Sequence, residues 1–198
     1  ADSISRTFTV HPKPLAGFRA DTVCFLETTS FTDTSSVASG SIVQYSWAFG
    51  DAGTSTTANP THTYASADTF LVRLIVTTNE ACLDTVDQNV LVVPKPTVAW
   101  AVSPNDTVCV GSAQSFDGIV TANFGNVLSH YWDFDNGDIS LQEDTSYTFP
   151  TFGNYAVSFV AENDFGCRDT STGEIVVMPL PTVAISIDTG CHGQLTVF

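Results

Sequence analysis

The residues best suited to covalent chemistry in this chain are its five cysteines, which could form disulfides or hold a metal ion. They are Cys24, Cys82, Cys109, Cys167 and Cys191. No CxxC or HxxxH spacing accompanies them, which disfavours a zinc site. Cys24 and Cys109 are 85 residues apart, and so are Cys82 and Cys167, so the cysteines belong to a repeated unit.

The period of 85 residues extends well beyond the cysteines. It relates Phe31 to Phe116, Trp47 to Trp132, Phe49 to Phe134 and Pro94 to Pro179. No insertion or deletion interrupts it from Cys24 through Ala99, so one folded unit is used more than once. The sequence therefore predicts part of a longer array: the last strand of a preceding repeat in residues 1–13, complete repeats in 14–96 and 97–181, and the opening strands of a third repeat in 182–198.

Each complete repeat holds two cysteines, which predicts two disulfides within repeats, Cys24–Cys82 and Cys109–Cys167. Cys191 is then the first cysteine of a third repeat and is expected to be unpaired within this chain. The alternative is that the paired positions are buried free thiols. Closing a loop of this length would stabilise each repeat by about 4 kcal/mol in the chain-entropy model. Persistent disulfides indicate an oxidising, extracellular compartment.

The composition narrows the classes of partner. Six basic against 21 acidic residues give a net charge of −15, which disfavours nucleic acid and anionic membrane surfaces because both are bound through Lys and Arg clusters. No stretch approaches the roughly 18 apolar residues that a membrane-spanning helix needs, so we expect no membrane insertion. A hydrophobic fraction of 43% favours folded domains over a disordered spacer.

The chain is predicted to be all-β. Segments such as Ile42–Phe49, Leu71–Val76 and Tyr155–Val160 are rich in β-branched and aromatic residues and partly alternate with polar ones. Turn-forming residues separate them, and about seven short strands per repeat are typical of an antiparallel β-sandwich. The Pro-x-Pro junctions at Pro94–Pro96 and Pro179–Pro181 predict short, semi-rigid connections between repeats.

Three carboxylates of the second repeat could converge on a hard cation. Asp133 and Asp135 alternate on one face of a strand, and Asp138 follows just beyond it. Calcium takes about six to eight oxygen ligands, some of which turn carbonyls can supply, so these residues form a candidate calcium site. The alternative is a solvated acidic cluster that stabilises a turn. The first repeat offers only Asp51 nearby, and no other cofactor is predicted.

The strand and turn landmarks resemble the PKD (polycystic kidney disease) domain family, whose signature runs roughly WDFGDG, NPxHxY and GxYxVxLxV. The corresponding segments of the first repeat are Trp47–Gly53 (WAFGDAG), Asn59–Tyr64 (NPTHTY) and Asp68–Val76 (DTFLVRLIV). Those of the second repeat are Trp132–Asp138 (WDFDNGD), Ser146–Phe149 (SYTF) and Gly153–Val157 (GNYAV). The resemblance implies tandem immunoglobulin-like β-sandwiches. The second repeat lacks the NPxH element, and Ala48 replaces the aspartate of the signature in the first.

The resemblance also bears on His62 and Trp100. His62 lies in the NPxHxY element, which implies packing and hydrogen bonding at a strand end. No GxSxG, HExxH or glycine-rich phosphate motif accompanies it or His130, so we predict no enzyme and no catalytic residues. Trp100 stands where Phe18 and Ile185 stand in the other copies, which favours a core or junction contact over an exposed platform for sugars.

The cysteine-bearing phrases DTVC and GCxDT are similar to repeats of very large cell-surface adhesins of the Bacteroidota, some of which are exported by type 9 secretion and serve gliding or attachment. Four Asp-(Ser/Thr)-aliphatic sites resemble the O-glycosylation acceptor of secreted proteins from that group. Their hydroxyl residues are Ser3, Thr22, Thr85 and Thr107. The alternative is that Thr and Val at these sites simply favour strands.

These observations predict a non-catalytic segment of a long extracellular repeat protein at the cell surface. It would act as a rigid spacer or adhesive fibre, in adhesion, gliding or filament assembly. Its partners would be neighbouring repeats, identical chains in a fibre, surface glycans or other cell-surface proteins. The alternative is an accessory PKD region of a secreted enzyme that degrades polysaccharide or protein.

Overall fold

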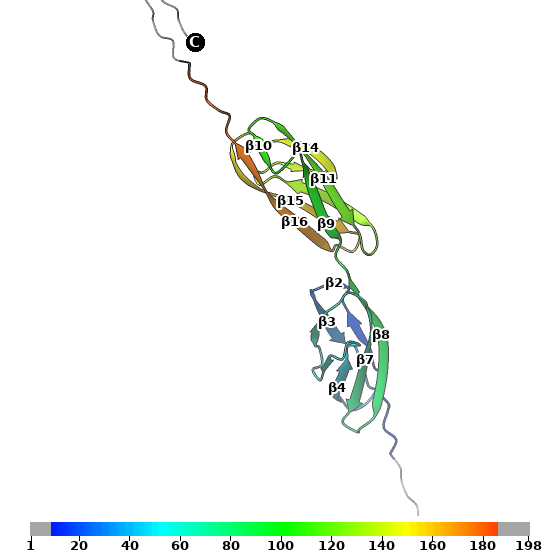
Figure 1. The fold of residues 1–198 in the computed structure, drawn as a ribbon. Helices are drawn as coiled ribbons and strands as arrows, with labels where there is room; N and C mark the ends of the chain where they lie inside the picture. Colours follow the sequence, from blue (N-terminus) through cyan, green and yellow to red (C-terminus); the bar gives the residue numbers. More distant parts are fainter. Residues whose placement is uncertain (1–8, 186–198) are drawn as a thin grey trace, which may run out of the picture. The chain divides into compact units, whose positions relative to one another are not determined.

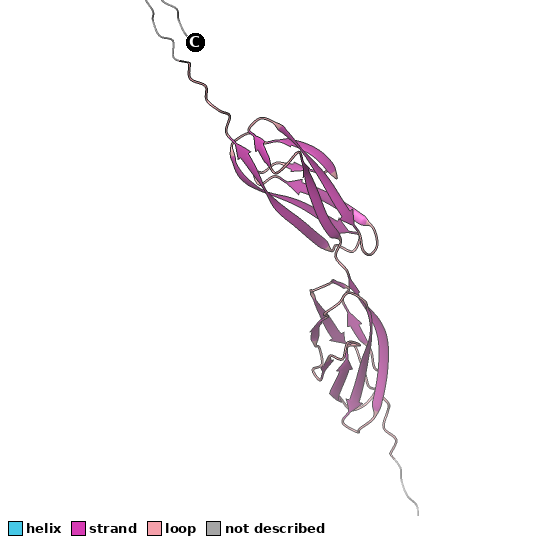
Figure 2. Ribbon diagram, viewed as in Figure 1, coloured by secondary structure: helices cyan, strands magenta, loops and turns pink. Residues whose placement is uncertain are grey.

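The computed structural model describes residues 9–185, and this part of the chain consists of strands and loops without any helix (Figure 2). The strands form four sheets, a three-stranded and a five-stranded sheet in each repeat (Figure 1). Each repeat is therefore a two-layer β-sandwich, which confirms the all-β prediction.

The first repeat contains eight strands, two of which have only two residues. Its three-stranded sheet has the order β1 (Phe18–Ala20), β3 (Thr28–Asp33) and β6 (Thr61–Thr63). Its five-stranded sheet has the order β2 (Val23–Cys24), β8 (Leu83–Val93), β7 (Thr69–Thr78), β4 (Ile42–Ala48) and β5 (Thr54–Ser55).

The second repeat has the same strand orders at equivalent positions. Its three-stranded sheet is ordered β14 (Asp144–Thr148), β11 (Ala113–Thr121) and β9 (Thr97–Ser103). Its five-stranded sheet is ordered β10 (Thr107–Cys109), β16 (Arg168–Met178), β15 (Gly153–Asn163), β12 (Val127–Asp133) and β13 (Ile139–Ser140). The strands expected at 42–49, 71–76 and 155–160 are all present.

One pair in each sandwich is parallel. Cys24 in β2 lies opposite Val93 at the end of β8, and Cys109 in β10 lies opposite Met178 at the end of β16. The long neighbouring strands β7 and β8 pair antiparallel, as the sequence predicted. Each first cysteine is therefore fixed beside the last residue of its repeat's final strand.

A buried tryptophan lies between the two sheets of each sandwich. Trp47 packs against Phe18 and Phe31 from the opposite sheet, and its indole N–H donates to the carbonyl of Thr57 at 2.9 Å. In β7, Val72 and Leu74 face the same core on alternate positions, which is the pattern that a half-buried strand requires.

The second sandwich uses the same arrangement. Trp132 is fully buried and contacts Phe116 and Phe159, while its N–H donates to the carbonyls of Gln142 and Glu143. Because the N–H has a partner, the large ring is buried without leaving an unsatisfied polar group.

The compact units do not coincide with the repeats. Within residues 9–185, the first unit combines the residues up to Val98 with Val120–His130 and Val160–Thr170, and the second contains Ala99–Ile119, Tyr131–Phe159 and the residues from Ser171. The hairpin between β15 and β16 therefore belongs to the same unit as the first repeat.

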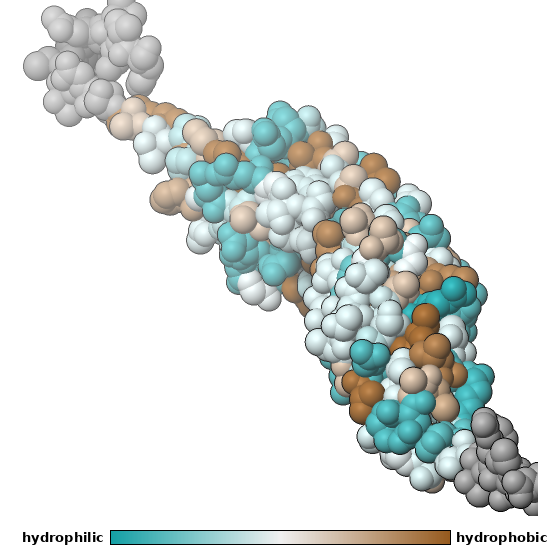
Figure 3. Space-filling view, turned by 90° about the horizontal axis from the view of Figure 1, so that it is seen from below, coloured by the Kyte–Doolittle hydropathy of each residue, from teal (hydrophilic) through white to brown (hydrophobic). Residues whose placement is uncertain are grey.

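The exposed surface is mixed. On the face drawn in Figure 3, apolar residues lie interspersed among polar ones rather than in one continuous strip. The exposed aromatic side chains of the described residues include Phe124 and Phe165, whose rings tilt against each other at 5.2 Å between centroids and so do not form a flat platform.

The substitution Trp132→Ala is expected to destabilise the second repeat by about 3–5 kcal/mol, because it removes a fully buried ring and leaves a cavity. Urea unfolding followed by circular dichroism would measure this loss. Phe152→Ala is the matched control, since Phe152 is 67% exposed in the same repeat and its removal should cost within about 0.5 kcal/mol. Equal effects of the two substitutions would contradict the assignment of Trp132 as the core residue.

Candidate functional site

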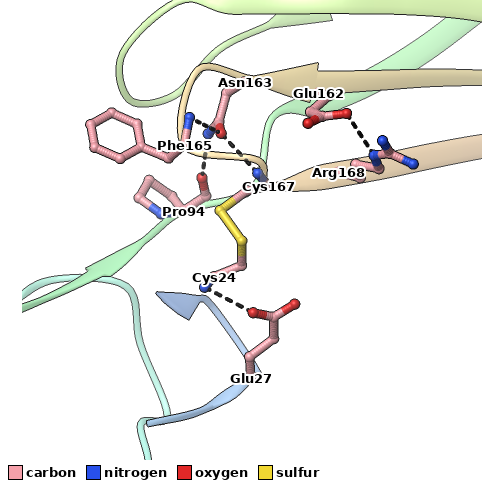
Figure 4. The surroundings of a disulfide bond; sticks show 8 residues. All are labelled: Cys24, Glu27, Pro94, Glu162, Asn163, Phe165, Cys167 and Arg168. Carbon is pink, nitrogen blue, oxygen red and sulfur yellow. Dashed lines mark hydrogen bonds and ion pairs between the residues drawn. A yellow bond between two sulfur atoms is a disulfide. The ribbon is translucent and has the colours of Figure 1, made fainter. Parts of the chain in front are cut away.

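One disulfide is formed among the described residues, and it joins Cys24 of the first repeat to Cys167 of the second (Figure 4). The two Cα atoms are 5.5 Å apart, within the range that a disulfide requires. The cysteines are 143 residues apart in the sequence, so the bond closes a loop that contains most of both repeats.

The disulfide lies in a small apolar cluster. Cys24 and Cys167 are 8% and 1% exposed, and Val93 and Leu91 from β8 pack against them. The backbone N–H of Cys24 donates to the Glu27 carboxylate at 3.2 Å, which fixes the turn that follows β2. The disulfide is therefore shielded from solvent, and its Cys24 end is positioned by both packing and a hydrogen bond.

The Cys24–Cys167 disulfide and the chain segments around it form the joint between the two repeats. Asn163 makes hydrogen bonds on the side of this joint that carries Cys167. Its side-chain oxygen accepts hydrogen bonds from the N–H groups of Phe165 at 3.1 Å and Cys167 at 3.0 Å. Its amide nitrogen donates to the carbonyl of Pro94 in the junction at 3.3 Å, as Figure 4 shows. Asn163 is fully buried, so it positions both the hairpin and the chain that connects the repeats.

A second asparagine contacts the same junction. The side-chain amide of Asn123 donates to the carbonyl of Lys95 and to the hydroxyl of Thr97, both at 2.8 Å. The sequence patterns did not single out Asn123 or Asn163. The one available signal was that both lie in stretches rich in turn-forming residues.

The predicted disulfides within repeats, Cys24–Cys82 and Cys109–Cys167, are wrong. Cys24 lies beside Val93 at the end of β8, whereas Cys82 directly precedes Leu83 at the start of that strand. An 11-residue strand separates them by roughly 35 Å, far more than a disulfide spans. The same geometry of β10 and β16 separates Cys109 from Cys167.

The other cysteines of the described chain are free thiols. Cys109 is exposed, and Cys82 is partly exposed with only a weak contact from its sulfur to the Glu80 carbonyl at 3.9 Å. Cys191, expected to be unpaired, lies outside the described residues.

The three carboxylates proposed as calcium ligands do not converge. Among residues 9–185, no group of three or more His, Cys, Asp or Glu side chains is placed to hold a metal ion. Asp133 accepts the N–H of Asp135 at 3.0 Å, Asp135 accepts the N–H of Ala156 at 3.1 Å, and Asp138 accepts the Tyr147 hydroxyl. These residues stabilise the turn between β12 and β13, which was the alternative interpretation.

The His62 side chain packs against the core of the first repeat and contacts the neighbouring turn. Its ring stacks on Phe49 at 4.3 Å between centroids, and its Nε2 lies 2.7 Å from the Asp51 carboxylate. In the second repeat Tyr147 occupies the equivalent position and stacks on Phe134 at 3.9 Å. A stacked ring bonded to the neighbouring turn is thus retained while the imidazole is not, which argues against a catalytic role for His62.

Trp100 is a core residue rather than a sugar platform. Its ring lies edge-on to Trp132 at 5.7 Å and tilts against Phe116 at 6.0 Å, while its N–H donates to the Ser171 carbonyl at 3.1 Å. These contacts confirm the prediction made from its equivalence to Phe18.

The candidate glycosylation residues Thr22, Thr85 and Thr107 are all exposed. Ser3 lies outside the described residues. The Thr107 hydroxyl donates to the Asp106 carboxylate at 3.3 Å. Exposure makes these sites accessible to modification.

Two packed sheets around a buried tryptophan define both repeats as immunoglobulin-like β-sandwiches. The family model of the PKD domain matches residues 11–93 and 94–177, and the chain belongs to this family as two tandem PKD domains.

The relatives include a protease. The chain is 31% identical over 140 residues, or 71% of its length, to the pre-pro-metalloprotease PrtV of Vibrio cholerae, of which it spans 15%. The solved PKD1 domain of V. cholerae PrtV is 37% identical over 42% of this chain and 98% of that domain, with a TM-score of 0.37. The PKD1 domain of Vibrio anguillarum Epp is 28% identical over 42% of this chain and 96% of that domain, with a TM-score of 0.40.

Peptide mapping after thiol alkylation should find the Cys24 and Cys167 peptides linked to each other and Cys82 and Cys109 alkylated. Trypsin combined with an Asp-specific protease separates all four peptides. Cys24→Ser should lower stability by about 2–4 kcal/mol, whereas the control Cys82→Ser should have little effect. Linkage of Cys24 to Cys82 would refute the assignment.

Asp51→Asn is expected to reduce the acid sensitivity of the first repeat. Burial alone would raise the pKa of Asp51, but hydrogen bonds from His62 and the Gly53 N–H outweigh it and hold the pKa below its usual value. The contribution is present above the usual pKa of an aspartate and is lost as the pH falls through the lowered value.

Urea unfolding at pH 5 and pH 2 would test this sign. The stability lost on acidification should be smaller in Asp51→Asn than in the parent by about 1 kcal/mol. Asp21→Asn, which changes an exposed carboxylate of the same repeat, is the control and should leave the loss unchanged. An unaltered loss in Asp51→Asn would contradict the role of the His62 hydrogen bond.

Proposed function

We propose that these tandem PKD domains form a non-catalytic, rigid spacer in a long extracellular repeat protein at the cell surface, where the array serves adhesion, gliding or filament assembly. The observation that carries the proposal is the Cys24–Cys167 disulfide, because it fastens neighbouring repeats to each other rather than stabilising either repeat alone.

The covalent path through the chain supports a load-bearing role. When the ends of the chain are pulled, tension passes from Cys24 through the disulfide to Cys167, so the residues between them carry none. The loop of 143 residues has a fully extended length of roughly 500 Å, which the bond withholds from extension. Such a segment transmits force with little lengthening.

The disulfide supports an extracellular location. A shielded disulfide persists in an oxidising compartment and is rare in the cytosol. The net charge of −15 favours a dispersed, hydrated surface. In the described part of the chain, no helix has the length and apolarity needed to cross a bilayer.

The repeat architecture supports the proposed partners. Neighbouring repeats of the same kind are the first partners, and identical chains, surface glycans and other surface proteins are the partners of an assembled fibre. Glycans on Thr22, Thr85 and Thr107 would add further bulk and protection to the exposed surface of the two domains.

An accessory region of an extracellular protease is the second candidate, and the similarity to part of PrtV favours it. In that role the domains would bind or position the substrate of a neighbouring catalytic domain. The chain itself should then be retained on an insoluble protein substrate, whereas a spacer should pass through the same column.

Single-molecule pulling between the chain termini is expected to show that the oxidised protein extends roughly 500 Å less on full unfolding than the reduced protein. Cys24→Ser should behave like the reduced protein under oxidising conditions, and Cys82→Ser should retain the short extension. Equal extension of oxidised and reduced chains, together with retention on substrate, would favour the accessory role.

A further inference from the structure

We propose that Cys109 and Cys82 each form a disulfide to a different neighbouring repeat, in the way that Cys24 and Cys167 are joined to each other. Cys109 would pair with the second cysteine of a PKD repeat that follows, and Cys82 with the first cysteine of a PKD repeat that precedes. An array of such repeats then carries a ladder of disulfides, each linking one repeat to the next. The inference rests on the proposed array, but its test uses only residues of this chain.

The half of the joint that contains the first cysteine has the same geometry in both repeats. Cys24 pairs in register with Val93, and Cys109 pairs in register with Met178. After Cys24, the N–H of Phe25 donates to the Val93 carbonyl at 2.8 Å. After Cys109, the N–H of Val110 donates to the Met178 carbonyl at 2.9 Å. The backbone therefore presents both cysteines in the same way.

The turn that follows each first cysteine is also repeated. The N–H of Glu27 donates to the Cys24 carbonyl at 2.9 Å, and the N–H of Ser112 donates to the Cys109 carbonyl at 3.1 Å. The backbone around Cys109 therefore makes the same hydrogen bonds as the backbone around Cys24, although Cys109 is a free thiol.

The half that contains the second cysteine is a hairpin tip with equivalent hydrogen bonds. The N–H groups of Thr78 and Asn163 donate to the carbonyls of Cys82 and Cys167, each at 3.0 Å. The side-chain oxygens of Thr78 and Asn163 accept the N–H groups of the same cysteines, at 3.2 Å and 3.0 Å.

The backbone of the two hairpins agrees as well. Ala81 and Gly166, which precede the cysteines, both adopt left-handed φ values of 60° and 80°. An alanine accepts this conformation only at a steric cost, so its presence in the first repeat indicates that the hairpin shape is imposed. Cys82 is thereby presented as Cys167 is.

The residue beside the first cysteine is buried in the formed joint and exposed at its counterpart in the second repeat. Val93 beside Cys24 is 1% exposed, whereas the equivalent Met178 beside Cys109 is 49% exposed. A following hairpin on Met178 would cover it as β15–β16 covers Val93. The apolar surface beside Cys109 is therefore suited to contact with the cysteine-bearing hairpin of another repeat.

The bond forms by thiol–disulfide exchange with a small disulfide oxidant such as oxidised glutathione. One cysteine thiolate attacks the oxidant and releases one glutathione thiol, leaving a mixed disulfide. The second cysteine thiolate displaces the other glutathione. The two protein thiols lose two electrons and two protons, and one oxidised glutathione becomes two reduced molecules.

The test inserts a second copy of residues 97–181 between Pro181 and Thr182, in a Cys191→Ser background. The junction sequence is kept because Thr97 follows Pro96 as Thr182 follows Pro181. The inserted copy carries Cys109→Ser, which removes its own first thiol, and Arg168→Lys, which changes the mass of its second cysteine peptide. The protein is equilibrated in glutathione redox buffer, alkylated, and digested with trypsin and an Asp-specific protease.

The expected result is that the inserted Cys167 peptide is linked to the Cys109 peptide and the original Cys167 peptide to the Cys24 peptide. Free thiol at Cys109 should fall from nearly full alkylation in the parent to less than a tenth. A control insert with its own Cys167→Ser should restore alkylation of Cys109. Alkylated Cys109 beside an intact Cys24–Cys167 bond, or Cys109 linked to the original Cys167, would overturn the proposal.

A complementary insertion tests the other half. A second copy of residues 15–96 placed after Pro14 should link its Cys24 to the original Cys82, while Cys24 of the parent stays linked to Cys167. Retention of that parent bond shows in either protein that the repeats are folded. If the parent bond forms but the new disulfides at Cys109 and Cys82 do not, the inference is wrong. The spacer function is tested separately, by the pulling and substrate-retention experiments.

Discussion

The two cysteines of each repeat lie at opposite ends of its last strand, and the architecture of the joint depends on this placement. One cysteine precedes the strand in a hairpin, and the other is held beside the strand's final residue by a short parallel pair. Since a strand of 11 residues is roughly 35 Å long, a repeat cannot close a disulfide on itself. The partner of Cys24 is Cys167 of the neighbouring repeat, so this bond fastens one domain to the next.

The two cysteines stay far apart because the sandwich core keeps the ends of the last strand in position. Trp47 and Trp132 fill the space between the sheets, and their N–H groups are satisfied by loop carbonyls, so β8 and β16 have a fixed packing surface. The turns around this core are chemically different in the two repeats. Asp51 and His62 in the first correspond to Asn136 and Tyr147 in the second, and both pairs hold a ring stacked on a core phenylalanine.

Such variation shows how the family can change the surface without changing the frame. Gly50 in the first repeat and Asp135 in the second occupy the same left-handed position, with φ values of 90° and 61°. The aspartate is accommodated there because its carboxylate accepts the Ala156 N–H. The acidic residues of this turn make local hydrogen bonds, and the two PKD domains share the same strand orders.

The sequence by itself determined the repeat, the strands, the buried tryptophans and the class of fold, because each of these depends on spacing along one chain. It also predicted disulfides from cysteines that recur with the period, of which the structure forms one, between Cys24 and Cys167. It did not determine their partners, because the choice depends on which strand ends approach within 5.5 Å, and the register of β2 on β8 is a property of the folded sheet. Only the tertiary structure shows that Asp133, Asp135 and Asp138 accept hydrogen bonds from three different donors, because one of these donors, the Ala156 N–H, comes from a strand that is distant in the sequence.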